Sequence, residues 1–191
     1  IELKRRGLEL KEAFNQINRY QRHSFGANSA LFQYVQIFII SNGVNTKYFA
    51  NSDQHYKFEL TFYWTDAANN RKSQLMDFSD EFFEKKHLID MIDEYMIIND
   101  TDKVLMVMRP YQIWAVKALA KQALETANNA YVWAATGSGK TLTSFKTAQI
   151  LARNKDIKKV VFVIDRQDLD TQSVEEFNKF EKDSVDTTTN T

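Results

Sequence analysis

The residues with the clearest chemical meaning are Thr136-Gly137-Ser138-Gly139-Lys140-Thr141, which have the composition of a phosphate-binding loop. Gly137 and Gly139 carry no Cβ, so the backbone can curl until consecutive N–H groups point at one anion. The following helix adds the positive end of its dipole to these donors. Lys140 can reach the β- and γ-phosphates of a nucleotide, and the Thr141 hydroxyl can bind Mg²⁺. The pattern predicts a bound nucleotide with its metal.

The sequence on either side of this loop agrees with a strand–loop–helix unit. Residues 130–135 form an apolar run that predicts a strand, and residues 142–152 have helical periodicity. Ala134 stands where the pattern usually begins with glycine, a replacement that is common among helicase-like motors. The alternative is a glycine-rich turn that only caps a helix. Such a turn does not require Lys140-Thr141 directly after the second glycine, whereas a phosphate-binding loop does.

Two further groups of polar residues are candidates for nucleotide and DNA contacts. Arg109-Pro110-Tyr111-Gln112 precedes the loop by about one helix length, and the Gln112 amide can donate and accept at the edge of adenine. Asp165-Arg166 follows the apolar run 160–164, at the strand end where parallel sheets present ligands. Arg166 is therefore a candidate contact to a DNA phosphate. A helix N-terminus rich in Asp explains the same residues equally well.

A second set of candidate residues lies near the N-terminus. Glu2 and Lys4 are two residues apart, and on a strand such residues share a face. Glu2 could then hold a divalent metal, while Lys4 positions water or stabilises charge in the transition state. Gln16 and Tyr20 have the i, i+4 spacing that places them on one face of a helix. Because such patterns are common by chance, ordinary surface charges remain the alternative.

The elements that position these residues follow from periodicity and turn signals. One Pro and five Gly in 191 residues favour long regular elements. Helices are predicted over residues 8–21, from about Ala30, over 79–95 with Ser79 as cap, over 110–127 and over 169–180. Strands are predicted over residues 36–41, 47–50 after an Asn42-Gly43 turn, 58–64, 130–135 and 160–164. We place a domain boundary near residue 100, between a mixed α+β part and the opening βαβ of a nucleotide-binding sheet.

Composition limits the remaining possibilities. An apolar fraction of 43% supports a packed core, and the absence of Cys excludes disulfides and Cys-ligated zinc. The formal net charge is +0, although residues 1–23 hold six Lys/Arg against three Asp/Glu, which fits a phosphate-contacting face or a solvated helix face. With no signal peptide or membrane-length apolar run, we expect a cytoplasmic protein without membrane contact. His23, His55 and His87 lack metal-ligand spacing and are interpreted as surface residues.

Taken together, these residues resemble the restriction (motor and endonuclease) subunit of type I restriction–modification enzymes over essentially the whole chain. The matching stretches, in the family's order and spacing, are residues 2–4, 13–20, 40–43, 47–51, 108–113, 136–146 and 163–170. The resemblance implies an α/β chain. Residues 1–100 would be the end of a PD-(D/E)xK-type α+β nuclease domain, and residues 101–191 the first part of a RecA-like parallel-sheet P-loop domain.

The resemblance also assigns roles to the candidate residues. In the nuclease pattern Glu2 is a metal ligand, Lys4 is the catalytic lysine, and Gln16 and Tyr20 match the associated Gln-x-x-x-Tyr element. In a superfamily-two translocase of double-stranded DNA, the residues that bind ATP match Arg109, Gln112, Thr136, Gly137, Ser138, Gly139, Lys140 and Thr141. Thr141 would also bind Mg²⁺, and Arg166 would contact DNA. The implied cofactors are ATP and Mg²⁺, and the implied partners are duplex DNA with methyltransferase and specificity subunits.

The chain departs from the family pattern in what it lacks. Because the first residue is Ile and the last eleven are mostly polar, we expect both ends to be cut. The Asp-bearing strand before Glu2 is missing, as are the downstream acidic pair and the second motor domain with its arginine finger. We expect the 191 residues alone to bind nucleotide weakly, without cutting DNA or turning over ATP. Two other interpretations stay open: a superfamily-two helicase or repair translocase without nuclease activity, and a non-catalytic nucleotide-binding module with subunit partners.

Overall fold

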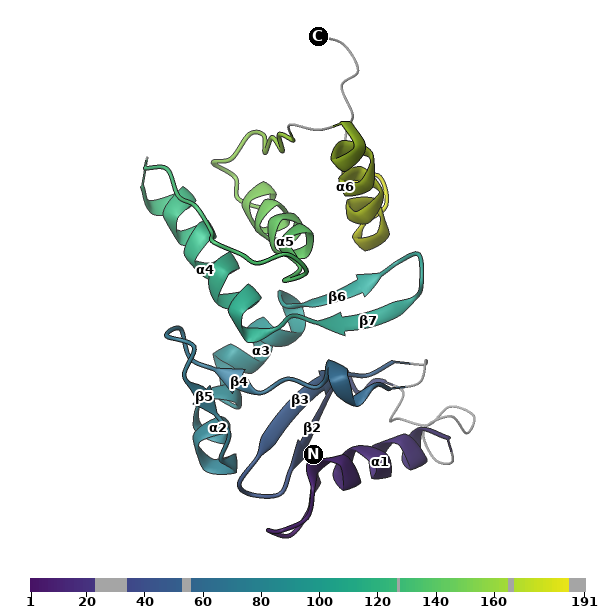
Figure 1. Cartoon of the computed structure of the whole chain (residues 1–191). Coiled ribbons are helices and arrows are strands. Elements are labelled where there is room, and N and C mark those ends of the chain that lie inside the picture. Colours follow the sequence, from purple (N-terminus) through teal and green to yellow (C-terminus); the bar gives the residue numbers. More distant parts are fainter. Residues whose placement is uncertain (23–33, 53–55, 127, 165–166, 186–191) are drawn as a thin grey trace. The chain divides into compact units, whose positions relative to one another are not determined.

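The structure, a computed structural model, describes residues 1–22, 34–52, 56–126, 128–164 and 167–185, without the side chains of 167–172 (Figure 1). The chain divides into two compact units, one formed by Ile1–Ile98 with Lys103–Pro110 and the other by Asn99–Asp102 with Tyr111–Thr191. The described residues form helices and three small sheets, so the chain is a mixed α/β structure as predicted. Within the described ranges, no helix is both long enough and apolar enough to cross a membrane.

The first unit is built on a three-stranded sheet in the order β1-β2-β3. Strand β1 (Glu2–Leu3) runs parallel to β2 (Ile37–Ser41), which pairs in antiparallel fashion with β3 (Thr46–Ala50). The predicted hairpin is confirmed. Gly43 makes its turn possible with a φ of 85°, and the Asn42 side chain accepts hydrogen bonds from the two N–H groups that follow Gly43.

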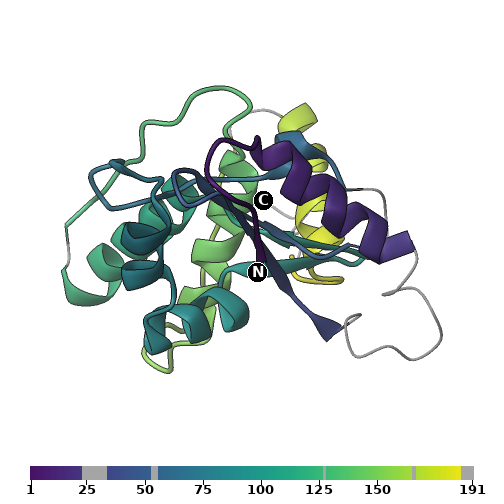
Figure 2. The ribbon, with the colours of Figure 1, turned by 90° about the horizontal axis from the view of Figure 1, so that it is seen from below.

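Helix α1 (Leu10–Tyr20) lies beside this sheet and confirms the predicted helix over 8–21 to within two residues (Figures 1 and 2). Its apolar stripe packs on aromatic and aliphatic side chains of β2 and β3, and the ring centroids of Phe14 and Phe49 are 5.4 Å apart. The buried members are Leu10, Ala13, Phe14, Ile17, Phe38, Ile40 and Phe49. Because this stripe fixes the rotation of α1, it also fixes where the polar side chains at its margin lie.

The predicted strand over residues 58–64 is wrong for most of its length. Residues Phe58–Leu60 form a 3₁₀ helix, and Phe62 makes only an isolated bridge to Tyr48. The regular pairing that remains is the short ladder of β4 (Trp64–Thr65) with β5 (Arg71–Lys72). The cause is local, since the hydroxyl and the N–H of Thr61 both donate to the carbonyl of Phe58 and close a turn that competes with the strand.

The single helix predicted over residues 79–95 is two helices, α2 (Leu75–Phe82) and α3 (Lys85–Asp93). Glu84 separates them because its carboxylate accepts the N–H groups of Lys86 and His87 and caps α3. Ser79, the predicted cap, lies inside α2. His87 also corrects the sequence interpretation: it is half-buried, with its ring 4.6 Å from that of Trp64.

Strands β6 (Met96–Asn99) and β7 (Val104–Val107) form a two-stranded sheet, and the residues after β7 are joined to the first unit. The fully buried Tyr48 donates its hydroxyl to the carbonyl of Met108 at 2.9 Å. Burial raises the pKa of Tyr48 well above its usual value, so the phenol stays protonated as a donor.

The second unit contains α4 (Pro110–Glu125), α5 (Lys140–Ala152) and α6 (Gln167–Phe180). The three predicted helices in this part of the chain are confirmed, with ends that differ by about two residues. Phe145 of α5 packs against Phe177 and Phe180 of α6, with ring centroids 5.4 and 5.2 Å apart. This aromatic contact joins α5, the helix after the phosphate loop, to α6.

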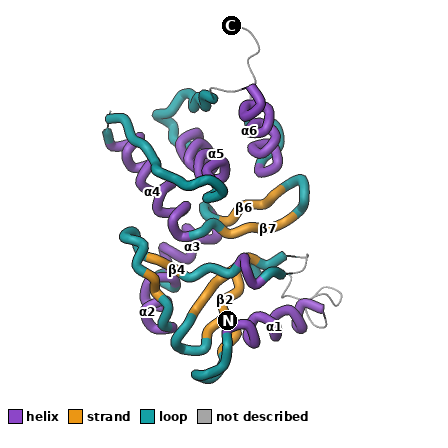
Figure 3. The backbone as a smooth tube through the Cα atoms, viewed as in Figure 1, coloured by secondary structure: helices purple, strands orange, loops and turns teal. Residues whose placement is uncertain are grey.

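The predicted strands over 130–135 and 160–164 are absent, so the described residues of the second unit form no parallel βαβ sheet. Both segments are drawn as loop in Figure 3. They expose large apolar side chains, including Trp133 at 94% and Val163 at 84%. A strand that is apolar on both faces needs hydrogen-bonding neighbours and cover on both sides, and the described residues supply neither. The predicted helix from about Ala30 and the predicted surface positions of His23 and His55 lie outside the described residues.

Candidate functional site

At strand β1 the charged side chains are less exposed than the apolar side chain between them. Glu2 and Lys4 lie on the face that α1 covers, and their side chains are only 18% and 19% exposed. Leu3 between them points the other way and is 56% exposed. The register of β1 with β2 fixes this arrangement, because Glu2 pairs with Ile40 and the Lys4 N–H donates to the Ser41 carbonyl at 2.8 Å.

The four residues predicted for the nuclease site form one continuous chain of hydrogen bonds. Lys4 Nζ lies 2.8 Å from Glu2 Oε1 and also donates to Gln16 Oε1. The other end of the Gln16 amide donates to the hydroxyl of Tyr20, one helical turn further along α1. Residues that are twelve and more positions apart thus meet at one place on the first unit.

The fit of a metal ion to this cluster is partial. Mg²⁺ takes oxygen ligands, often one or two carboxylates completed by water and substrate phosphates. Glu2 supplies one such carboxylate, and one of its oxygens already contacts the Lys4 ammonium. In the ranges that the structure describes, no three His, Cys, Asp or Glu side chains gather closely enough to hold a metal. Glu2 therefore fits as one ligand of a site that needs further oxygens.

The phosphate loop in the second unit has the backbone form that its sequence predicts. Gly137 and Gly139 have φ values of 75° and 77°, in the left-handed region that favours glycine. Lys140 and Thr141 are the first two residues of α5. Among the described residues, no hydrogen bond uses the N–H groups of Gly137, Gly139 or Lys140. Free N–H groups at a helix start suit an anion such as a nucleotide phosphate.

The side chains of the loop hold its shape. Ser138 donates both its N–H and its hydroxyl to the Ala135 carbonyl, at 3.2 and 2.7 Å. The Lys140 ammonium lies over the loop, 3.3 Å from the carbonyl oxygen of Ala135. Thr136 is exposed at its start. The loop thus fits a phosphate group, with Lys140 at its centre and the Thr141 hydroxyl available as a metal ligand.

Helix α4 anchors this loop through two neighbouring side chains. The Tyr111 hydroxyl donates to the Ser138 carbonyl at 2.7 Å, and Gln112 Nε2 donates to the carbonyls of Ser138 and Gly139 at 3.2 and 3.4 Å. Gln112 is only 4% exposed. The predicted adenine reader is therefore also a support of the phosphate loop. Tyr111 was missed by the sequence reasoning, and its only signal was its place beside Gln112.

A substitution at Gly139 tests this support. Alanine there would carry a left-handed backbone cost of about 1–2 kcal/mol, and its Cβ would lie 2.4 Å from Gln112 Nε2. We expect Gly139→Ala to displace the Gln112 amide and to weaken ATP binding, measured by isothermal titration calorimetry on the full chain. The weakening should exceed that of Gly137→Ala.

The matched control for this experiment is already in the loop. Gly137 has nearly the same φ as Gly139, but a Cβ there would meet nothing within 4 Å. The two alanine variants therefore share the backbone cost and differ only in the contact with Gln112. Equal loss of ATP affinity in both variants would show that the Gln112 anchor does not matter for the loop.

The remaining predicted site residues are not part of these clusters. Arg109 belongs to the first unit, where its guanidinium lies 5.2 Å from the centre of the Phe62 ring. Arg166, the predicted DNA contact, lies outside the described residues.

Two family comparisons match different parts of the chain. Residues 1–57 match the family described as "Type I restriction enzyme R protein N terminus". Residues 105–191 match the family described as "Type III restriction enzyme, res subunit". The first match contains the cluster of Glu2, Lys4, Gln16 and Tyr20, and the second contains the phosphate loop.

Curated relatives match the chain across this division. The type I restriction enzyme SauCOLORF180P endonuclease subunit of Staphylococcus aureus is 56% identical over 191 residues, which are 100% of this chain and 20% of the relative. The EcoprrI endonuclease subunit of Escherichia coli is 44% identical over 62% of this chain and 38% of its own length. For a protein of Mycoplasma pneumoniae described as the C-terminal part of the putative MpnIIP endonuclease subunit, the identity is 38% over 67% of this chain and 66% of the relative. This chain belongs to the family of type I restriction enzyme endonuclease subunits and spans about one fifth of the length of its Staphylococcus relatives.

Proposed function

We propose that this chain is the nuclease-to-motor part of a type I restriction endonuclease, which uses ATP to move along duplex DNA and Mg²⁺ to cut it. The observation that carries the proposal is the continuous hydrogen-bonded chain from Glu2 through Lys4 and Gln16 to Tyr20. A phosphate loop of suitable geometry in the same polypeptide supports the ATP-dependent part. The boundary between nuclease and motor parts would lie near residue 100.

Each residue of the nuclease cluster has a distinct proposed task. Glu2 would hold Mg²⁺, which supplies an activated water and polarises the scissile phosphate when bound. The Lys4 ammonium would stabilise the negative charge that develops on that phosphate. Gln16 accepts from Lys4 and donates to Tyr20, so it fixes the position of the ammonium from the helix side. This support matters because small misplacements of a catalytic group cost large factors in rate.

The phosphate loop would bind the nucleotide that drives movement. The free N–H groups of Gly137, Gly139 and Lys140 would contact phosphate oxygens, and the Lys140 ammonium would neutralise charge on the β- and γ-phosphates. Thr141 would hold the accompanying Mg²⁺. Gln112 would keep the loop in place from α4 and read the adenine, and Arg166 would contact DNA.

The complete activity requires more than this chain. Its Staphylococcus relatives are about five times longer, and a nuclease and motor of this class would act with methyltransferase and specificity subunits on double-stranded DNA. Tests of activity therefore use the assembled restriction enzyme. In that setting the proposal predicts that DNA cleavage depends on both ATP and Mg²⁺.

The test is linearisation of circular duplex DNA by the assembled enzyme. With ATP and Mg²⁺ present, cleavage is expected; when ATP is omitted or Mg²⁺ is removed by a chelator, cleavage should fall below detection and return when the missing component is restored. Cleavage that persists without ATP would contradict the motor-coupled nuclease. ATP hydrolysis stimulated by DNA but never followed by cleavage would favour the translocase without nuclease activity.

A further inference from the structure

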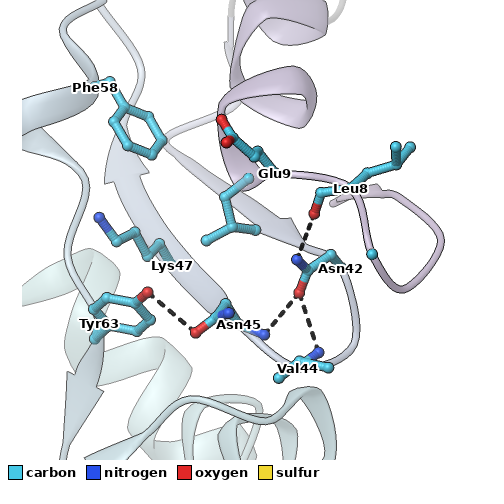
Figure 4. A pocket seen from close by; sticks show the side chains of 10 residues that line it. Leu8, Glu9, Asn42, Val44, Asn45, Lys47, Phe58 and Tyr63 are labelled. Carbon is cyan, nitrogen blue, oxygen red and sulfur yellow. Dashed lines mark hydrogen bonds between the residues drawn. The ribbon is translucent and has the colours of Figure 1, made fainter.

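A pocket of about 470 Å³ opens in the first unit between the start of α1 and the β2–β3 hairpin (Figure 4). Its wall includes Glu9, Asn45, Lys47, Phe58 and Tyr63, which come from four separate parts of the fold. None of the proposed nuclease or ATP-binding residues lines it. The pocket is thus a separate feature whose polar and aromatic lining consists of one cation, one carboxylate, two amides and two aromatic rings.

Lys47 is the central polar group of this pocket. Its ammonium donates to Thr61 Oγ1 at 3.2 Å and lies 4.7 Å from the centre of the Phe58 ring and 4.8 Å from that of Tyr63. Burial, followed by the charge of Arg71, lowers the pKa of Lys47 from its usual value. In the part of the chain that the structure describes, no carboxylate pairs with this ammonium.

Arg71 places a second cation beside the same ring. Its guanidinium carbon lies 4.2 Å from the centre of the Tyr63 ring, and within the described ranges it too has no ion-pair partner. The Tyr63 hydroxyl donates to Asn45 Oδ1 at 3.2 Å, which leaves the Asn45 NH₂ group as an available donor in the pocket wall (Figure 4). Two cations that repel each other and an amide donor are a combination that an anion would stabilise.

The register of the sheet places this pocket on the face that carries the nuclease cluster. Lys47 pairs with Ile40, and Ile40 pairs with Glu2 on its other side, so the three side chains share one face. With neighbouring strands about 4.8 Å apart, Lys47 lies about 10 Å from Glu2 across the sheet. A DNA strand advances about 3.4 Å per nucleotide, so that distance corresponds to about three nucleotides.

We propose that Lys47, Arg71 and Asn45 form a binding site for a backbone phosphate of duplex DNA, separate from the phosphate that is cut at Glu2. This inference rests on the proposed nuclease function. Phosphate oxygens accept several hydrogen bonds at once from ammonium, guanidinium and amide groups. The contact reads no base, so it holds the duplex in register without contributing to the choice of sequence.

Substitution of Glu9 tests the proposal with an expected effect of opposite sign. It lines the same pocket, is exposed, and as the residue before α1 makes no side-chain capping bond. Its negative charge opposes a phosphate in the pocket. Removing that charge should therefore strengthen DNA binding, whereas removing Lys47 or Arg71 should weaken it. Loss of fold alone would not produce changes in both directions.

The experiment measures binding of a labelled DNA duplex to the full chain by fluorescence anisotropy over a range of salt concentrations. Lys47→Gln and Arg71→Gln should each weaken binding roughly tenfold, as expected for a lost hydrogen bond to a charged group. The slope of log affinity against log salt should fall by about one for each. Glu9→Gln should bind more tightly, Lys47→Arg should retain binding, and the exposed Lys85→Gln on α3 should not change it.

Three other outcomes would each contradict a stated part of the proposal. If the unsubstituted chain binds duplex DNA and Lys47→Gln and Arg71→Gln match Lys85→Gln, the phosphate site is wrong and the proposed nuclease function stands. If the unsubstituted chain binds no duplex, the phosphate site is wrong, and the proposed nuclease function is decided separately by DNA cleavage with the assembled enzyme. If calorimetry with inorganic phosphate shows a loss in Lys47→Gln while duplex affinity is unchanged, the pocket takes a free phosphate and the DNA assignment is wrong. Thermal unfolding of every variant confirms that the proteins compared are folded.

Discussion

Replacement of Lys140 by alanine is expected to lower ATP hydrolysis by the assembled enzyme roughly a hundred- to a thousandfold, the usual loss when one preorganised charge-stabilising donor is removed. The structure places this ammonium over the phosphate loop, next to N–H groups that no other described residue uses. Without Lys140, the charge that develops on the transferred phosphate loses its nearest cation in the loop. DNA cleavage should fall with ATP hydrolysis, because in the proposed function cutting depends on ATP-driven movement.

A matched control for Lys140→Ala is available on α4. Lys121 is 72% exposed and makes only a weak pair with Glu125, at 3.9 Å. Lys121→Ala removes the same charge from the same unit without touching the loop, so ATP hydrolysis should stay at the unsubstituted level. Steady-state phosphate release, measured with saturating duplex DNA, separates the two variants. Equal rates in both would show that Lys140 does not bind the nucleotide.

Replacement of Lys4 by alanine is expected to slow DNA cleavage roughly a hundred- to a thousandfold, while ATP hydrolysis continues. Lys4 is the group that joins Glu2 on the strand to Gln16 on the helix, so its removal disconnects Glu2 from Gln16 and Tyr20. The Glu2 carboxylate would then lose its cationic partner, and the scissile phosphate would lose the ammonium that stabilises its developing charge. The motor part is not altered by this change.

The control for Lys4→Ala is Lys11→Ala on α1. Lys11 is exposed, and in the described residues it makes no hydrogen bond or ion pair. It lies within the same short basic segment, so its removal reproduces the loss of net charge. We expect cleavage of circular DNA to proceed normally in Lys11→Ala. If Lys4→Ala cut DNA as fast as Lys11→Ala, the proposed nuclease cluster would be wrong.

The sequence predicted those features that depend on local chemistry. Gly137 and Gly139 adopt left-handed φ values because the loop needs residues without a Cβ, and that need is visible in the composition. The alternation that places Glu2 and Lys4 on one face is confirmed, as is the i, i+4 pairing of Gln16 with Tyr20. In each case the spacing of a few residues was sufficient.

Features that depend on competition between neighbours were not predictable. The helix expected over 79–95 is divided because the Glu84 carboxylate caps a new helix, and periodicity alone does not reveal such a cap. The Thr61 hydroxyl likewise replaces a strand with a turn. The strands expected over 130–135 and 160–164 have suitable composition, but strand formation requires partners that the described residues do not provide. The Lys47 pocket joins four parts of the chain, so only the folded arrangement reveals it.

The most direct test of the account measures DNA cleavage and ATP hydrolysis in the same reactions, with assembled enzymes that carry the unsubstituted chain, Lys4→Ala or Lys140→Ala. The account predicts that the unsubstituted enzyme does both, that Lys4→Ala hydrolyses ATP without cutting, and that Lys140→Ala does neither. Cleavage by Lys140→Ala at the unsubstituted rate, or by Lys4→Ala at that rate, would contradict it.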